Sequence, residues 1–235
     1  MNYFKTLLLA ASALSLHSCA SLTGYQDGRA LGEEKTEVGV SLNVSQSPDF
    51  FYDDGEEVLD ENFAFPNLEL TGRYGVSDKF DVGVKLNTNL NLSITTKYQF
   101  LGDRQSKAAM AIGADVGTFG IISSLWNAQL PLYFSLHPSD KFTWYLSPRY
   151  IFQFATGDLS TNISYLGGNT GLLFGRKHKF GFDLGYYNLT DFDGSGVNLL
   201  TIGIGGKFVF GGKDEDTMDD EMAPEENKKP KRRRK

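Results

Sequence analysis

The chain has 235 residues, enough for one large domain or two small ones, and 23 Lys and Arg against 29 Asp and Glu give it a formal charge of −6. This balance offers no general case for nucleic-acid binding, and the single cysteine excludes an internal disulfide framework and a cysteine-cluster metal site. With 18 Phe, 11 Tyr and 26 Gly against 7 Pro, the composition suits strands and tight turns. After the first 16 residues, no stretch is long and apolar enough to span a membrane as a helix.

Residues 1–18 have the features of an export signal. Lys5 precedes an apolar stretch that is too short for a membrane span. Leu16-His17-Ser18 then precedes the only cysteine, Cys19, and this tetrapeptide resembles a bacterial lipobox, with an unusual His17. The resemblance implies cleavage before Cys19 and lipid attachment to its sulfur. Ordinary cleavage nearby is the alternative. A single acyl chain binds a membrane only marginally, so a permanent anchor needs more chains or a second contact.

A polar stretch over residues 19–35 predicts an N-terminal linker, which would carry the lipid. Apolar residues then recur at every second position, beginning with Val38, Val40 and Leu42, and a period of two predicts strands. The alternation returns in ten segments: 38–44, 68–74, 80–86, 92–100, 108–116, 128–136, 142–152, 166–174, 180–186 and 200–210. Pro131 and Pro148 lie inside these segments, and each predicts a bulge or a strand end because proline cannot donate a ladder hydrogen bond.

Short and long connections alternate along the chain. The short, polar turns are 77–79, 101–106, 137–141 and 175–178, and the long links are 46–62, 118–125, 153–163 and 188–196. The short link at 87–90 breaks this pattern. Segregation of short and long connections is typical of outer-membrane barrels, which have short periplasmic turns and longer external loops.

The alternation would also fit a soluble, lipocalin-like barrel with its apolar face inward. The placement of the aromatic residues favours a membrane barrel, because rings gather at the two membrane interfaces. One set on the apolar face lies mostly beside the short turns: Tyr74, Phe80, Tyr98, Phe100, Phe134, Phe142, Trp144, Phe174, Phe180, Phe208 and Phe210. A sparser set, Phe152, Phe154 and Tyr186, lies toward the long links.

Residues 38–210 thus resemble the bacterial outer-membrane β-barrel superfamily, including a last strand that ends in the aromatic Phe210. In that superfamily the aromatic residue ends the chain, whereas here a tail follows. The resemblance implies an all-β fold, a transmembrane antiparallel up-and-down barrel of about ten strands over residues 36–210. It also implies an outer-membrane location with both termini periplasmic, contact with outer-membrane lipids and insertion by the barrel assembly machinery. It implies no activity.

If the apolar set faces lipid, the alternate set faces the lumen. This set contains five acids and five bases: Glu37, Glu69, Asp81, Asp115, Asp183, Arg73, Lys85, Lys97, Arg149 and Lys207. Equal numbers favour a paired network that fills the interior, because unpaired buried charges are costly. The alternative is a charged pore lining. Inward glycines support the pore by leaving room for water: Gly39, Gly75, Gly83, Gly113, Gly181, Gly203 and Gly205.

No catalytic residue, cofactor or metal site is predicted. The mature chain has only His137 and His178, both expected as exposed residues of short turns, far from the rim where surface hydrolases work. The longest loop carries seven acids between Asp49 and Glu61, but neither it nor the segment 191–194 has calcium-loop spacing. We expect a solvated acidic loop.

Residues 211–235 form an acidic and then basic tail without an apolar pattern, which predicts periplasmic disorder. Its basic end fits an anionic periplasmic partner such as phospholipid headgroups. The sequence therefore favours a non-enzymatic outer-membrane barrel with a structural or surface-interaction role in the cell envelope. A narrow diffusion pore or small-solute channel is the alternative, and an outer-membrane enzyme is the third hypothesis.

Overall fold

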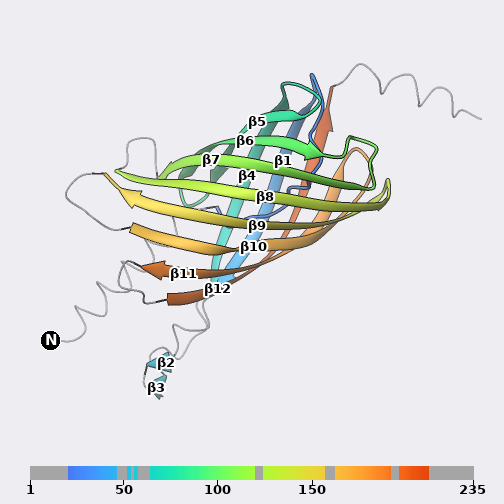
Figure 1. Cartoon of the computed structure of the whole chain (residues 1–235). Helices are drawn as coiled ribbons and strands as arrows, with labels where there is room; N and C mark the ends of the chain where they lie inside the picture. The colour runs from blue at the N-terminus through green and yellow to red at the C-terminus, as the bar shows by residue number, and fades with distance from the viewer. Residues whose placement is uncertain are drawn as a thin grey trace, which may run out of the picture.

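The protein forms a closed, all-antiparallel barrel of ten strands, seen here in a computed structural model (Figure 1). The structure describes residues 21–46, 52–53, 56–57, 64–119, 124–156, 162–191 and 196–211. The barrel strands are β1 (Thr36–Gln46), β4 (Ala64–Gly75), β5 (Phe80–Asn87), β6 (Asn91–Leu101), β7 (Ala108–Phe119), β8 (Leu125–Ser139), β9 (Phe142–Ala155), β10 (Asn162–Phe174), β11 (Lys179–Asp191) and β12 (Gly196–Phe210). Strands adjacent in this order pair with each other, and β1 closes the barrel against β12. The ten predicted strands are confirmed, and β2 (Tyr52–Asp53) and β3 (Glu56–Glu57) add a separate hairpin.

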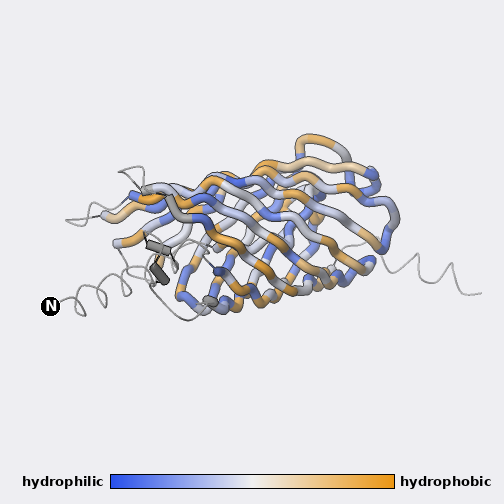
Figure 2. Tube along the Cα trace, turned by 90° about the horizontal axis from the view of Figure 1, so that it is seen from below, coloured by the Kyte–Doolittle hydropathy of each residue, from blue (hydrophilic) through white to orange (hydrophobic). Residues whose placement is uncertain are grey.

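The alternation of side chains along each strand sorts apolar residues to the outside and polar residues to the lumen. In β1, Val38 and Leu42 are each 46% exposed, whereas Glu37 and Asn43 are buried. Figure 2 shows hydrophobic and hydrophilic residues alternating along the strands. A soluble barrel would bury its apolar set, so the lipocalin-like alternative is wrong. In the part of the chain that the structure describes, no helix has the length and apolarity needed to cross a membrane.

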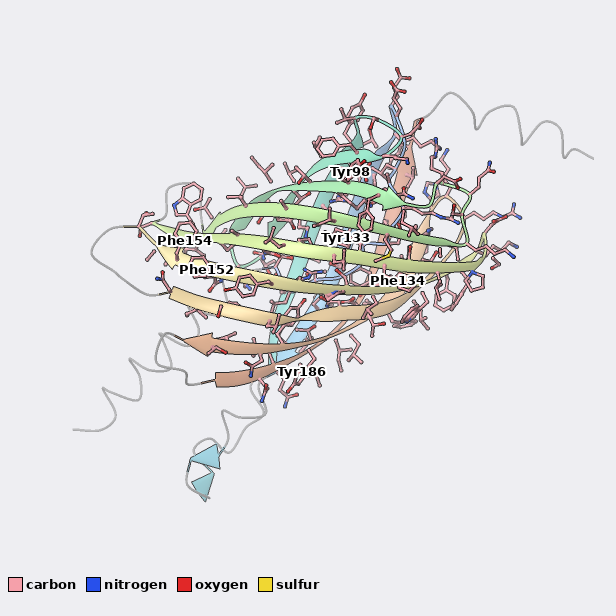
Figure 3. All side chains as sticks on the ribbon, viewed as in Figure 1. Tyr98, Tyr133, Phe134, Phe152, Phe154 and Tyr186 are labelled. Carbon is pink, nitrogen blue, oxygen red and sulfur yellow. The ribbon has the colours of Figure 1, made fainter. Side chains whose placement is uncertain are left out.

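Aromatic side chains on the outer face gather toward the two ends of the barrel. Three ring pairs lie near the short turns, with centroid distances of 5.8 Å for Phe134–Trp144, 5.5 Å for Phe142–Phe174 and 5.5 Å for Phe180–Phe208. Toward the opposite end, Phe152 and Phe154 stack at 5.7 Å (Figure 3). This arrangement agrees with the two predicted aromatic sets and is that of an interfacial girdle.

The two ends of the barrel differ mainly in one long connection, residues 47–63 between β1 and β4, while the other connections at both ends have two to six residues. We call the end that carries the connections after β4, β6, β8 and β10 the short-turn end, and the opposite end the long-loop end. The predicted turn over 137–141 is shorter than expected, because β8 continues to Ser139 and β9 begins at Phe142. The pairing of β8 with β9 shifts register between Leu136 and Ser139, so the strand is irregular as it approaches this turn.

The prediction of a bulge or a strand end at Pro131 and Pro148 is wrong. The β7–β8 pairing is interrupted between Gln129 and Leu132, and the β8–β9 pairing is interrupted between Pro131 and Phe134. Both pairings continue beyond the gap in the same register. Pro148 lies on β9, and in the pairing of β9 with β10 it stands opposite Gly168 in regular register. Proline removes ladder bonds locally, while the long pairings on either side hold the register.

Candidate functional site in the lumen

Residues 21–35, which we call the lumen segment, run through the inside of the barrel and reach its end, where Glu33 and Glu34 are exposed. Ser21, Thr23, Gln26 and Asp27 are 1%, 2%, 3% and 4% exposed. The segment was predicted to be a linker outside the barrel because it is polar, but a segment that fills a polar lumen must be polar as well. The segment therefore belongs to the interior of the barrel and is not a linker beside it.

The backbone of the lumen segment donates hydrogen bonds to side chains of the barrel wall. These bonds give the buried backbone N–H groups of the segment the acceptors that a neighbouring strand would otherwise supply. The five bonds run from Gly24 N to Asp183 Oδ2 (3.1 Å), from Tyr25 N to Tyr145 OH (3.0 Å), from Gly28 N to Ser135 Oγ (2.9 Å), from Ala30 N to Gln99 Oε1 (2.7 Å) and from Leu31 N to Asp81 Oδ1 (3.0 Å). The acceptors lie on β11, β9, β8, β6 and β5, so the segment is fixed to much of the wall.

The lumen segment reaches the short-turn end before it enters β1. Leu22 packs within the lumen against Ile151, Tyr187 and Leu199, whereas Gly32 lies against Gly75 at the end of β4. A Cβ at Gly75 would come within 1.8 Å of the Gly32 carbonyl oxygen, so this close approach requires glycine. Gly75 was expected to leave room for water, but its space is taken by the chain itself.

All ten charged residues predicted to face the lumen are buried there. Their exposed fractions do not exceed the 5% of Lys207. Seven of them form ion pairs: Lys85–Asp115 (3.2 Å), Lys97–Asp81 (3.3 Å), Arg73–Asp81 (3.9 Å) and Lys207–Glu37 (3.5 Å). A paired network therefore exists, although it is not the five-by-five pairing that equal numbers suggested.

The other three charged residues bind the lumen segment or its neighbours. The hydroxyl of Ser21 donates to Glu69, and Arg149 Nη1 donates to the Ser21 carbonyl oxygen at 3.4 Å. Asp183 accepts from Gly24 N and from the Tyr145 hydroxyl. Within the described ranges, none of these three charges has an ion pair within 4.0 Å. They therefore act as anchors of the lumen segment.

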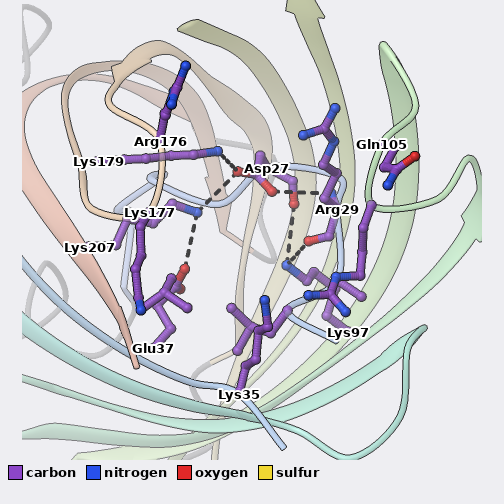
Figure 4. Close-up of a pocket in the computed structure, with 14 residues that line it drawn as sticks. Asp27, Arg29, Lys35, Glu37, Lys97, Gln105, Arg176, Lys177, Lys179 and Lys207 are labelled. Carbon is purple, nitrogen blue, oxygen red and sulfur yellow. Dashed lines mark hydrogen bonds and ion pairs between the residues drawn. The ribbon is translucent and has the colours of Figure 1, made fainter. Parts of the chain in front are cut away.

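Asp27 joins the network from the lumen segment, and the sequence analysis missed it. Its Oδ2 lies 3.2 Å from Lys179 Nζ and 3.3 Å from Lys207 Nζ (Figure 4). Burial alone would raise the pKa of the Asp27 carboxyl, but the ammonium groups of Lys179 and Lys207 hold it well below its usual range. The Asp27-Gly28 dipeptide is typical of a turn. It gave no sign that Asp27 bridges β11 and β12.

Four large tyrosines fill the lumen beside the charges: Tyr133, Tyr145, Tyr165 and Tyr187. The inward set described from the sequence contained charges and glycines only. The Tyr187 hydroxyl donates to Asn169, and the Tyr133 ring centroid lies 5.9 Å from Lys97 Nζ. These rings occupy volume that a wet pore would leave to water.

The prediction for His137 is wrong, and the one for His178 is confirmed. His137 is buried on β8, with Nε2 2.8 Å from Ser135 Oγ and Nδ1 3.0 Å from Thr143 Oγ1. Because β8 runs past residue 137, its alternation turns this ring into the lumen. His178 is exposed in the turn before β11, against the rings of Phe208 and Phe210. The Ser135–His137 pair has hydrolase-like chemistry, but Ser135 is 0% exposed and Gly28 N occupies its oxygen.

A cavity of about 640 Å³ opens at the short-turn end; we call it the vestibule (Figure 4). Its lining includes two carboxylates, Asp27 and Glu37, and the neutral Gln105. It also includes eight cationic side chains: Arg29, Lys35, Lys97, Arg104, Arg176, Lys177, Lys179 and Lys207. The vestibule is therefore a basic cavity on a chain with a net negative charge.

Several predicted features lie outside the described residues. These are the export signal over 1–18 with Cys19, the acidic side chains between Asp49 and Glu61, the segment 192–195 and the tail beyond residue 211. Their assignments stay predictions.

No protein-family model and no curated protein matches the chain. Among solved structures, it is similar to the outer membrane protein OprG from Pseudomonas aeruginosa, with 14% identity over 78% of this chain and 100% of that chain and a TM-score of 0.35. It is also similar to an outer membrane channel from Pseudomonas putida F1 (12% identity, 80% and 100% coverage, TM-score 0.40) and to Ail, the attachment invasion locus protein of Yersinia pestis (14% identity, 76% and 99% coverage, TM-score 0.31). At these identities the likeness concerns the fold alone.

Proposed function

We propose that the protein is a closed, non-enzymatic outer-membrane barrel with a structural or surface-interaction role in the cell envelope. The observation that carries the proposal is the lumen segment, which is bound through its backbone to five strands of the wall. Beside it, the space lined by Thr23, Gln26 and Ser41 measures only about 10 Å³, roughly the room of one water. A lumen filled in this way supports a barrel that does not conduct solutes.

The outer-membrane location rests on the outer surface of the barrel. Exposed apolar side chains flanked by aromatic rings form the surface that a bilayer covers, and closed barrels cross membranes because they leave no unpaired edge. Since short turns are periplasmic in such barrels, we propose that the short-turn end faces the periplasm. β12 ends there, so the C-terminal tail would be periplasmic.

The lipid on Cys19 is a separate part of the proposal. Cys19 lies two positions before Ser21, and two residues span at most about 7 Å. Ser21 is held in the lumen by Glu69 and Arg149. We therefore propose that lipidation of Cys19 and burial of Ser21 compete, so that a lipid in the periplasmic leaflet requires the first residues of the lumen segment to leave their site.

The absence of enzyme activity is proposed from the enclosure of the contact between Ser135 and His137. Ser135 and His137 lie behind the lumen segment, where a substrate would first have to displace Gly28 from the serine oxygen. A general base must reach the proton that it removes, and this pair is closed to substrate in the structure. We therefore rank an outer-membrane enzyme below both other functions.

Single-channel recording in planar bilayers tests the proposal. The wild-type chain is expected to show no stable conductance. Gly28→Val is expected to conduct, because a Cβ at Gly28 would lie 2.4 Å from the Ala109 carbonyl oxygen and force the lumen segment off the wall. Gly72→Val is the matched control: a Cβ there meets only Val84 at 3.7 Å, an ordinary contact on the outer face.

A narrow diffusion pore is the second candidate, and the vestibule favours it, because a cavity of about 640 Å³ already opens one end of the lumen. Stable conductance by the wild-type chain, unchanged by Gly28→Val, would overturn the closed barrel in favour of this pore. No conductance by either glycine variant, with both folded, would also remove the role given to the lumen segment.

A further inference from the structure

The vestibule separates its positive charge into an inner and an outer layer. The inner cations are neutralised, since Lys207 lies 3.3 Å from Asp27 and 3.5 Å from Glu37, and Lys179 lies 3.2 Å from Asp27. The outer layer comes from two turns, which carry Arg104 and the pair Arg176-Lys177. Among the described residues that line the cavity, the carboxylates are Asp27 and Glu37, against eight cationic side chains.

The ion pair of Arg104 points away from the vestibule. Arg104 Nη1 lies 3.7 Å from Asp78 Oδ1, and the Asp78 side chain is 74% exposed. A pair with so much water around it is weak and exchanges easily. Arg104 therefore stays available to a stronger anion that enters the cavity.

Arg29, which also lines the vestibule, has a hydrogen-bond donor without an acceptor in the described part of the chain. Its Nη2 donates to the Ser106 carbonyl oxygen, but its Nε is buried and has no hydrogen-bond partner among the described atoms. A buried N–H without an acceptor is costly, and guanidinium groups prefer the paired oxygens of a phosphate or carboxylate. Arg29 lines the vestibule, so an anion bound there can reach it.

We propose that the vestibule binds a small multivalent anion that carries phosphate groups, supplied as a free solute from the short-turn side. The cavity volume of about 640 Å³ lies in the range of small-molecule sites. Arginines from the lumen segment and from two separate turns converge on it, which suits an anion with several charged groups rather than one carboxylate. The site goes beyond the closed-barrel function, although both use the lumen segment, which contributes Arg29 to the vestibule.

Isothermal titration calorimetry with inorganic tripolyphosphate tests this site on the full chain in zwitterionic micelles. We expect saturable binding that weakens as the salt concentration rises. The double variant R176Q/K177Q is expected to bind at least tenfold more weakly. The matched control K79Q/K141Q removes the same charge from other turns of the same end, outside the vestibule, and is expected to stay within twofold of the wild type.

Each outcome decides a part of the inference. Undetectable binding at low salt, or equal losses in both double variants, would overturn the site and leave only diffuse surface charge. The same titration in nanodiscs then separates the two sources of phosphate. Affinity that is equal in phosphatidylcholine and phosphatidylglycerol nanodiscs supports the free solute, whereas loss of binding only with phosphatidylglycerol assigns the site to lipid headgroups and overturns the solute. Conductance plays no part in this readout, so the closed barrel stands or fails separately.

Discussion

The outer face and the lumen of this barrel are built from the same strands but by different rules. On the outer face, neighbours such as Val84 and Ile94 are 52% and 66% exposed, and any apolar side chain would meet lipid equally well there. In the lumen, by contrast, the buried charges depend on specific neighbours, as Lys85 depends on Asp115. One face is thus specified by a class of residue and the other by individual contacts. Single substitutions should therefore be tolerated outside and costly inside.

The largest loss of stability is expected for the lumen variant Lys85→Ala. It would leave the Asp115 carboxylate buried without its ion pair, since these side chains are 4% and 1% exposed. Loss of one partner of a buried pair costs about 3 to 5 kcal/mol of the free energy of unfolding. The temperature at which the barrel loses its folded gel mobility should fall accordingly.

The control for this experiment is Lys79→Ala in the exposed turn before β5, which should change the transition by no more than a surface pair, about 0 to 1 kcal/mol. Arg149→Ala extends the comparison to an anchor of the lumen segment, because it removes the donor to the Ser21 carbonyl oxygen. Equal mobility shifts for Lys85→Ala and Lys79→Ala would mean that water screens the lumen charges, which would favour the pore.

A smaller difference is expected when one hydroxyl is removed on each face. Tyr145→Phe deletes the donor to Asp183 and the acceptor of Tyr25 N, and both groups would stay buried. An unsatisfied buried group costs about 1 to 3 kcal/mol, so unfolding in urea should begin at a lower concentration. Tyr98→Phe, on the outer face and 49% exposed, is the control and should leave the urea midpoint unchanged. If Tyr98→Phe lowered the urea midpoint more than Tyr145→Phe, the contrast between a tolerant outer face and a specific lumen would be contradicted.

This contrast also explains what the sequence could predict. A period of two is a local property, so the ten strands, their outer residues and the ten inward charges such as Glu69 and Arg149 followed from it. Partners across the lumen are not local: Asp27 meets Lys207, 180 positions later, only after the barrel has closed. A polar stretch that lines the lumen has the same composition as a solvated linker. His137 was misplaced for a related reason, because β8 runs three residues past the predicted strand end at 136 and so buries a side chain assigned to a turn.

The smallest effect on the barrel is expected at Cys19, outside both faces. If Cys19 carries lipid, Cys19→Ala should abolish labelling by a fatty-acid probe while the barrel inserts and keeps its gel transition, because the exposed apolar wall holds it in the bilayer. The matched variant Ser45→Ala keeps Cys19 and should keep the label. A mature protein that begins at another residue, by mass spectrometry, would contradict the lipoprotein prediction. If lipidation of Cys19 competes with burial of Ser21, the lumen segment should resist protease better in the Cys19→Ala variant than in the wild type. Equal resistance in the two proteins would refute that competition.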